Sequence, residues 1–354
     1  MFRFESDYTE GAIPEILARL SETNFEQTAG YGEDAHTERA KALIRKACEA
    51  PDASVWLLVG GTQANRTVIT QLLRPHQGVL CADCGHIGIH ESGAIEASGH
   101  KVLPLPSDQG RVTAAQIEEA YTAHITNADA DHMVQPGMVY LSHPSEFGTL
   151  YTKEEMTAIS AVCRRLGLPL YIDGARLGYG LSAAENDLTL PDLAKLADVF
   201  TIGGTKVGAL FGEAVVFTND ALCRDFRYLI KQGGGLLAKG RLLGIQFETL
   251  FEDENGEEPA DAAATRYCRI AAHADRLADR LRKAFAAAGF EDAYPSGTDQ
   301  IFVKAPDEKL ESLKKEFAFS FWEKADETHS LVRFCTSWAT REEAVEALET
   351  ALHH

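Results

Sequence analysis

The feature that most constrains the fold is the alternation of short β-rich runs with amphipathic helical stretches. Ser54 to Val59 (SVWLLV) has the continuous apolar character of a buried strand, and a helical pattern follows at residues 62–73. Further strands are predicted at 78–82, 100–105, 137–142, 168–172, 198–202 and 213–217, and further helices at 113–122 and 152–166. Strands that alternate with helices form a mostly parallel sheet covered on both faces. The first two thirds of the chain therefore predict an α/β domain.

The pattern changes after the three glycines at 233–235. A helical region and an acidic, turn-prone break (Glu252 to Glu258) precede a long amphipathic helix predicted over 262–289. The tail predicts strands at 300–304 and 329–335 and a final helix from about 341, which we expect Thr340 to cap. We therefore expect a large domain (1–245) and a smaller α+β domain (246–354). Residues 1–14 are expected to form an N-terminal arm that packs near the small domain.

Charge and composition exclude several classes of function. The 354 residues carry 34 basic and 53 acidic side chains, a net charge of −19, which would repel the phosphates of a nucleic acid. No run approaches the roughly 18 apolar residues of a membrane helix, and the N-terminus lacks a secretion-signal pattern. Seven cysteines, most in apolar stretches, indicate free thiols in a reducing compartment. We expect a cytoplasmic protein that binds neither nucleic acid nor membrane.

Metal binding is also disfavoured. Cys81 and Cys84 form a CxxC pair with His86 close behind, but no second pair follows at the spacing of a zinc site. We therefore expect no metal.

Ligands of open α/β sheets bind at the carboxyl ends of the strands, so the residues after each strand matter most. After 54–59 come Gly60, Gly61 and Thr62, which lead into a helix; they form either a plain tight turn or an anion site made of backbone N–H groups and a hydroxyl. After 78–82 comes His86, which is either structural or a flat ring that stacks on a flat cofactor.

Two further strands end in an acid and in a lysine. Asp173 follows 168–172 and could cap a helix, bind a metal or pair with a cation. Lys206 follows 198–202 after Gly203, Gly204 and Thr205, and could hold a phosphate or be a desolvated amine poised to form a Schiff base. Neither the P-loop spacing nor the dinucleotide-binding fingerprint is present. A phosphate cradle, a flat ring, an acid and a lysine are together the set that pyridoxal 5'-phosphate requires.

These motifs resemble the pyridoxal-phosphate-dependent L-threonine aldolase family, of the low-specificity type within the β-eliminating lyases. The resemblance covers nearly the whole chain and rests on Glu5-Ser6-Asp7-Tyr8, Ala29 to Asp34, Gly60-Gly61-Thr62, Gly85-His86 with Glu91, Asp173-Gly174-Ala175-Arg176, Lys206, and Arg333 to Trp338. It implies the aspartate aminotransferase-like fold.

The resemblance also implies roles for individual residues. Lys206 would form the Schiff base, Asp173 would pair with the pyridine nitrogen, and His86 would stack on the ring. The other implied cofactor contacts are Gly61, Thr62, Thr205 and Arg176, and the implied substrate contacts are Arg333, Ser6, Arg176 and Tyr31. Arg333 lies inside an apolar strand, where a charge needs a partner. The base is expected to be His86 or His143, although His143 is not clearly in register with the histidine of other members.

The implied reaction is retro-aldol cleavage of L-threonine or L-allo-threonine to glycine and acetaldehyde. A β-eliminating lyase or an aminotransferase is the alternative, because the same cofactor supports several bond cleavages. A pyridoxal-phosphate-binding protein without activity is the remote alternative.

The resemblance further implies a homodimer or homotetramer with the site at the subunit interface, where Tyr31 or residues 233–240 would reach the neighbour. Leu237 stands where many members carry an arginine for the neighbour's phosphate, and Lys231 or Lys239 could replace it.

Overall fold

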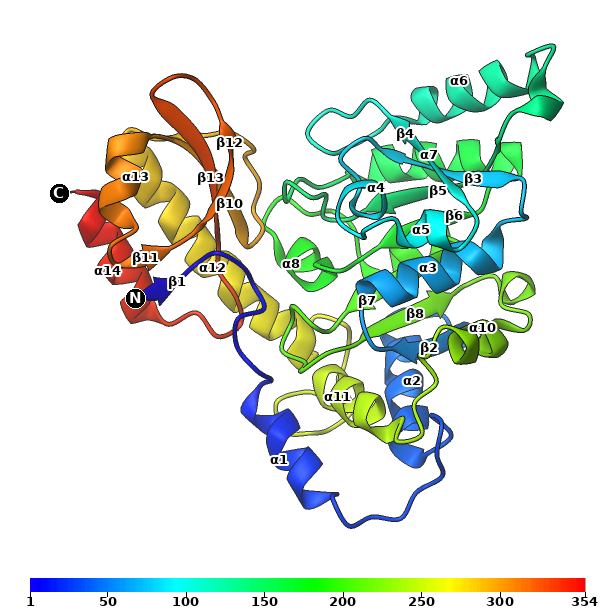
Figure 1. The fold of residues 1–354 in the computed structure, drawn as a ribbon. Helices are drawn as coiled ribbons and strands as arrows, with labels where there is room; N and C mark the ends of the chain where they lie inside the picture. Colours follow the sequence, from blue (N-terminus) through cyan, green and yellow to red (C-terminus); the bar gives the residue numbers. More distant parts are fainter. Residues whose placement is uncertain (354) are drawn as a thin grey trace.

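The large part of the computed structural model, which describes residues 1–353, is built on a seven-stranded sheet (Figure 1). Its strands are β2 (Ser54–Leu58), β3 (Gln77–Ala82), β4 (Lys101–Leu105), β5 (Gln135–Ser142), β6 (Leu170–Asp173), β7 (Val199–Gly203) and β8 (Glu213–Phe217). The spatial order is β2-β8-β7-β6-β5-β3-β4. Only β8 runs antiparallel to its neighbours β2 and β7, while the other pairs are parallel. The predicted mostly parallel α/β sheet is therefore confirmed.

Helices cover both faces of this sheet, so each strand sends apolar side chains in both directions. One core contains residues of α2 (Ala35–Ala47), α6 (Ala114–Ile125), α7 (Lys153–Leu166), α9 (Leu190–Leu196) and α11 (Arg241–Phe251), together with α1 (Pro14–Glu22) and α8 (Leu177–Ser182). The other contains residues of α3 (Gly61–Leu72), α4 (His86–Ile89), α5 (Ala94–Ala97) and α10 (Phe226–Gln232). Burial on two faces explains why these strands are continuous apolar runs.

Local capping explains where the predicted helices begin. Thr113 and Gln116 form a reciprocal capping box at the start of α6, and Thr152 and Glu155 form another at the start of α7. The cap expected from Thr340 is wrong. The last helix, α14 (Glu342–Leu352), has Arg341 at its N-cap, and the Thr340 hydroxyl accepts a hydrogen bond from the Ser337 N–H instead.

The smaller part holds an antiparallel four-stranded sheet in the order β12-β13-β10-β9. These strands are β9 (Glu291–Asp292), β10 (Gln300–Pro306), β12 (Ser320–Lys324) and β13 (His329–Cys335), and they pack with α12 (Arg266–Ala287), α13 (Asp307–Leu313) and α14. The long helix α12 passes between the two parts (Figure 1). Its residues up to Ala274 belong to the large core, whereas those from Leu277 onward belong to the small one. The division at residue 245 stays a prediction from the pattern.

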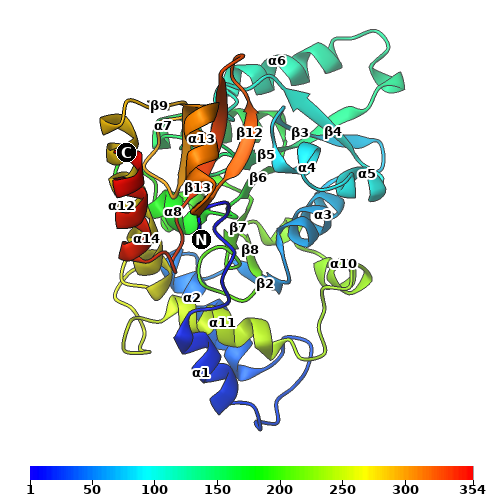
Figure 2. The same ribbon diagram turned by 60° about the vertical axis from the view of Figure 1, so that its left-hand side comes forward.

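The N-terminal segment lies against the small part before it crosses to α1 (Figure 2). β1 (Phe2–Arg3) pairs with β11 (Phe317–Ala318), and Phe4 is buried in the small core. The chain therefore passes from the small sheet to the edge of the large one within its first 14 residues. No helix within residues 1–353 is long and apolar enough to cross a membrane.

Candidate active site

A cavity of about 570 Å³ lies at the carboxyl ends of the large sheet's parallel strands, where Trp322 and Arg333 of the small sheet complete its wall. Because β8 is antiparallel, its first residue also lies at this edge. The cavity brings together ten residues of the predicted site or its motifs: Tyr8, Gly60, Gly61, Thr62, His86, Asp173, Ala175, Arg176, Thr205 and Lys206. Arg333 joins them from the small antiparallel sheet. Residues up to 325 positions apart in the sequence thus line one space.

Asp173 ends β6 and is held by four donors. Its Oδ2 accepts hydrogen bonds from Asn65 Nδ2 at 2.9 Å and from the Tyr140 hydroxyl at 2.7 Å. Its Oδ1 accepts one from the Ala175 N–H at 2.9 Å and a longer one from the Thr201 hydroxyl at 3.5 Å. Donors of this kind stabilise an ionised carboxylate, the form needed to pair with a protonated ring nitrogen.

His86 is oriented by two carboxyl groups. Its ring Nδ1 lies 2.7 Å from Glu91 Oε1, and its backbone N–H donates to Glu146 Oε1 at 2.8 Å. An ionised carboxylate only accepts, so Nδ1 carries the hydrogen in this pair. Asn65 Nδ2 also donates to Glu91, at 2.7 Å, and so joins the His86 pair to Asp173.

Lys206 stands in the turn after β7 and is fixed by its backbone. Its carbonyl accepts a hydrogen bond from the buried Tyr179 hydroxyl at 2.6 Å. Burial and the positive charge of Arg176 lower the pKa of the Lys206 amine, although Asp7, Asp173 and Glu213 oppose that shift. A lowered pKa favours the neutral, nucleophilic amine.

The first turn of α3 forms an uncapped helix N-terminus at the cavity. Gly60 is the N-cap residue and makes no side-chain capping hydrogen bond. The N–H groups of the first helical residues have no partner within a helix, and the helix dipole favours an anion there. Thr62 adds a hydroxyl on the cavity wall. This turn fits a phosphate group.

Arg333 forms no direct ion pair within residues 1–353, although its charge helps to lower the pKa of the nearby Asp7. It lies on β13, where Nη1 donates to Gln300 Oε1 at 3.0 Å and Nη2 donates to the Glu5 carbonyl at 3.2 Å. Its guanidinium lies 5.6 Å from the centre of the Trp322 ring. A guanidinium held only by neutral groups can bind a carboxylate in a bidentate manner.

Arg176 differs, because Asp7 already pairs with it. Its Nε and Nη2 donate to the two oxygens of Asp7 at 2.8 and 3.0 Å. Burial opposes the Asp7 charge, but Arg176 and other nearby cations outweigh it and lower the pKa of Asp7. Burial and the negative charge of Asp7 raise the pKa of the neighbouring Asp299 well above its usual range. Arg176 thus balances a buried acidic pair.

Three predicted residues do not line the cavity. His143 is fully buried, accepts a hydrogen bond from the Tyr151 N–H at 3.4 Å, and has its pKa lowered to about 4 by burial. It follows β5 and packs against Tyr151 of the first core, and its side chain is not part of the cavity wall, so direct action on the substrate does not fit its position in this structure. Ser6 is buried near the cavity, whose wall its neighbour Tyr8 forms instead.

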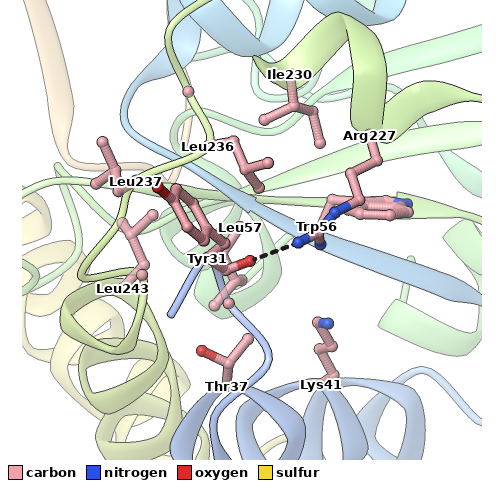
Figure 3. Close-up of a pocket in the computed structure, with 13 residues that line it drawn as sticks. Tyr31, Thr37, Lys41, Trp56, Leu57, Arg227, Ile230, Leu236, Leu237 and Leu243 are labelled. Atoms are coloured by element: carbon pink, nitrogen blue, oxygen red, sulfur yellow. Dashed lines mark hydrogen bonds between the residues drawn. The ribbon is translucent and has the colours of Figure 1, made fainter. Parts of the chain in front are cut away.

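Tyr31 lies in a separate hollow with Leu236, Leu237 and Trp56 (Figure 3). Its carbonyl accepts a hydrogen bond from Arg227 at 3.3 Å, and Lys231 Nζ lies 4.9 Å from its ring centre. Its side chain is 43% exposed. Within one chain, Tyr31 therefore does not reach the substrate space, and its role there stays a prediction.

Two acids in the cavity wall were not predicted from the sequence. Glu146 follows β5 in the loop that carries His143, and Glu213 begins β8 opposite Gly203. Glu213 accepts a hydrogen bond from the Thr205 hydroxyl at 3.0 Å, and burial raises its pKa to about 8. A charged residue in an apolar strand needs a partner, and this signal, which drew attention to Arg333, could also have identified Glu213.

The cysteine pair shows no sign of reactivity. Burial raises the pKa of Cys81 to about 12 and that of Cys84 to about 11, so both are thiols at neutral pH. No group of three or more His, Cys, Asp or Glu that could hold a metal ion occurs in the part of the chain that the structure describes.

Comparison with known proteins agrees with this geometry. A family model described as beta-eliminating lyase matches residues 3–308. A low specificity L-threonine aldolase from a Pseudomonas species is 33% identical over 351 residues, which are 98% of this chain and 95% of that protein. A solved structure of threonine aldolase from Leishmania major is 41% identical, with a TM-score of 0.94, and the match covers 100% of this chain and 99% of that one.

A more distant structure bears on the fold alone. Aspartate aminotransferase from Thermus thermophilus is 14% identical, with a TM-score of 0.71, over 100% of this chain and 90% of that one. The expected aspartate aminotransferase-like fold is therefore confirmed.

Proposed function

The chain belongs to the beta-eliminating lyase family, and we propose that it acts as a low-specificity L-threonine aldolase. Its reaction is the cleavage of L-threonine or L-allo-threonine to glycine and acetaldehyde. The observation that carries the proposal is the cavity itself, in which an amine with a lowered pKa (Lys206), a tightly held acid (Asp173) and an unpaired guanidinium (Arg333) face one space.

The residues of the cavity fit pyridoxal 5'-phosphate as the cofactor. The uncapped start of α3 with Thr62 would hold the phosphate, Asp173 the ring nitrogen, His86 one face of the ring, and Lys206 the aldehyde carbon. When bound, this cofactor supplies an electron sink for the pair left on Cα after a bond there breaks.

The remaining residues position the substrate. Arg333 binds the carboxylate of the amino acid, and the Trp322 ring supports the guanidinium from one side. Arg176 is proposed to act through Asp7, because a carboxylate already occupies its Nε and Nη2 donors, whereas the partners of Arg333 are neutral. Glu91, whose side chain is fully buried, would hold the His86 ring in the orientation in which it stacks on the cofactor ring.

Product analysis tests the proposal. The purified chain, supplied with pyridoxal 5'-phosphate, should convert L-threonine and L-allo-threonine to glycine and acetaldehyde in equal amounts. Ammonia and a keto acid in place of glycine would instead identify a β-eliminating lyase, and a keto acid formed without free ammonia, at the expense of an added amino-group acceptor, would identify an aminotransferase. Bound cofactor without turnover of either substrate would contradict all three activities.

We also propose a homo-oligomer, either a dimer or a tetramer, with the hollow around Tyr31 at the contact between subunits. The support is its apolar wall, formed by Leu236, Leu237 and Trp56 beside an exposed tyrosine. A monomer in light scattering would contradict this part. The proposed compartment is the cytoplasm, in keeping with seven free cysteines.

A further inference from the structure

Glu146 is a buried acid for which the proposed roles leave no task. It lies in the loop after β5 and lines the cavity, where it contacts the backbone of His86. Its Oε1 accepts hydrogen bonds from the Ser142 hydroxyl at 2.7 Å and from the His86 N–H at 2.8 Å. Its Oε2 is buried and has no hydrogen-bond partner among residues 1–353. One oxygen therefore fixes the carboxyl group while the other is free.

The proposed reaction needs a proton acceptor near the substrate's β-carbon. When the Cα–Cβ bond breaks, its electron pair stays on Cα. The O–H bond of the β-hydroxyl breaks as well, and its pair forms the carbonyl of the released aldehyde. The hydroxyl proton must pass to a base, and a proton is later returned to Cα to give glycine. A base held within hydrogen-bond reach is the usual solution.

The other titratable groups near the cavity suit this task less well. The His86 ring uses Nδ1 for Glu91 and is proposed to lie against the cofactor. His143 is buried outside the cavity. His90 lines the cavity and its ring centre lies 5.6 Å from that of His86, but its side chain is exposed and makes no hydrogen bond that would fix it within residues 1–353. Glu213 accepts a hydrogen bond from the hydroxyl of Thr205, in the turn that carries Lys206.

Glu146 also has the right electrostatic setting for a base. Burial raises the pKa of its carboxyl above the usual value, although hydrogen bonds from Ser142 and the His86 N–H work against the shift. A carboxylate with a raised pKa binds a proton more strongly than one in water.

We propose that Glu146 is the base that takes the β-hydroxyl proton of the substrate, through its free Oε2. This inference rests on the aldolase function proposed above. It assigns the task expected of His143 to another residue of the same loop, three positions further on.

The test separates cleavage from a reaction that needs no β-hydroxyl. The purified chain loaded with pyridoxal 5'-phosphate would be assayed for cleavage of L-threonine and for exchange of a glycine Cα proton with deuterium. In the Glu146→Gln variant, cleavage should fall by about 10²- to 10⁴-fold, the usual contribution of a general base. Glycine exchange should stay near the wild-type rate. The amide keeps an oxygen for Ser142 and the His86 N–H, and continued exchange shows that the site is folded.

A matched control changes the other carboxyl group that contacts His86. Glu91→Gln alters the orientation of the ring and should slow cleavage and exchange together. Glu146→Asp keeps an acid one methylene shorter and should recover part of the cleavage that Glu146→Gln loses.

Two results would overturn the inference alone: wild-type cleavage by Glu146→Gln, or equal loss of cleavage and exchange in that variant. No cleavage by the unaltered chain would overturn the aldolase function, and the inference with it.

Discussion

Replacing Arg333 with glutamine is expected to weaken substrate binding while the chain stays folded. The guanidinium makes only two hydrogen bonds, to Gln300 and to the Glu5 carbonyl, and both partners are neutral. Losing such bonds costs about 1 kcal/mol each. Arg333 forms no direct ion pair within residues 1–353, and the buried Asp7 keeps its closer partner Arg176, so the stability of the variant should fall much less than that of an Arg176 variant.

The effect on the reaction should be much larger. A substrate carboxylate would receive two charge-assisted hydrogen bonds from Arg333, and losing them removes about 3 kcal/mol. At about 1.4 kcal/mol per tenfold, kcat/KM for L-threonine should fall by about 150-fold, mostly through KM. Trp322, which supports the guanidinium, cannot replace its charge.

Arg176 provides the contrast. Its substitution by glutamine leaves the buried Asp7 without the cation that pairs with it, which costs about 3–5 kcal/mol for a broken buried pair. Arg176→Gln should therefore lower the Tm strongly, whereas Arg333→Gln should not.

The assay couples acetaldehyde release to its reduction and follows Tm on the same preparations. An unchanged KM in Arg333→Gln would refute the assignment of the substrate carboxylate to Arg333. So would the opposite pattern, in which Arg176→Gln raises KM at an unchanged Tm.

Three further predictions concern Glu213, Trp322 and His143. Because the pKa of Glu213 is raised to about 8, the folded chain keeps a proton that the unfolded chain releases near pH 4.5. The contribution of Glu213 to the free energy of unfolding is therefore complete at low pH and falls by about 1.4 kcal/mol per pH unit up to pH 8. Urea unfolding should show that Glu213→Gln removes this decline, and parallel curves would contradict the raised pKa. Trp322→Leu removes a cation–π contact worth about 0.5–2 kcal/mol and should raise the KM for threonine about 2- to 30-fold at constant kcat, with a smaller effect for Trp322→Phe; a fall in kcat instead would show another role. His143→Gln should keep kcat near the unaltered value in steady-state assays, because this ring lies outside the cavity, and a loss of about 10²-fold or more would restore His143 as the base.

The positions of the strands were predictable because burial on both faces of the sheet produces continuous apolar runs in the sequence. All seven strands of the large sheet were predicted within two residues at either end. The residues after them, such as Asp173 and Lys206, could be placed at one edge because parallel strands end on the same side. The antiparallel direction of β8 left no such signal, so Glu213 at its first residue was not expected at that edge.

Contacts between residues far apart in the sequence could not be predicted from local patterns. Asp7 lies 169 residues from Arg176, and only the folded chain shows that the two are paired. Tyr31 lies in a motif of the family and His143 lies near the position of the family's histidine, yet packing places Tyr31 in a separate hollow and buries His143. Thr340 was expected as a cap because hydroxyl residues favour that position, but its hydroxyl serves Ser337.

The central claim is that Lys206 carries the cofactor, and the most direct measurement is the site of covalent attachment. The purified chain would be treated with borohydride in the presence of pyridoxal 5'-phosphate, digested and analysed by mass spectrometry. The account predicts one reduced adduct, on the peptide that contains Lys206, and none after Lys206→Ala. An adduct on another lysine, or an unaltered yellow absorbance in the Lys206→Ala protein, would contradict it.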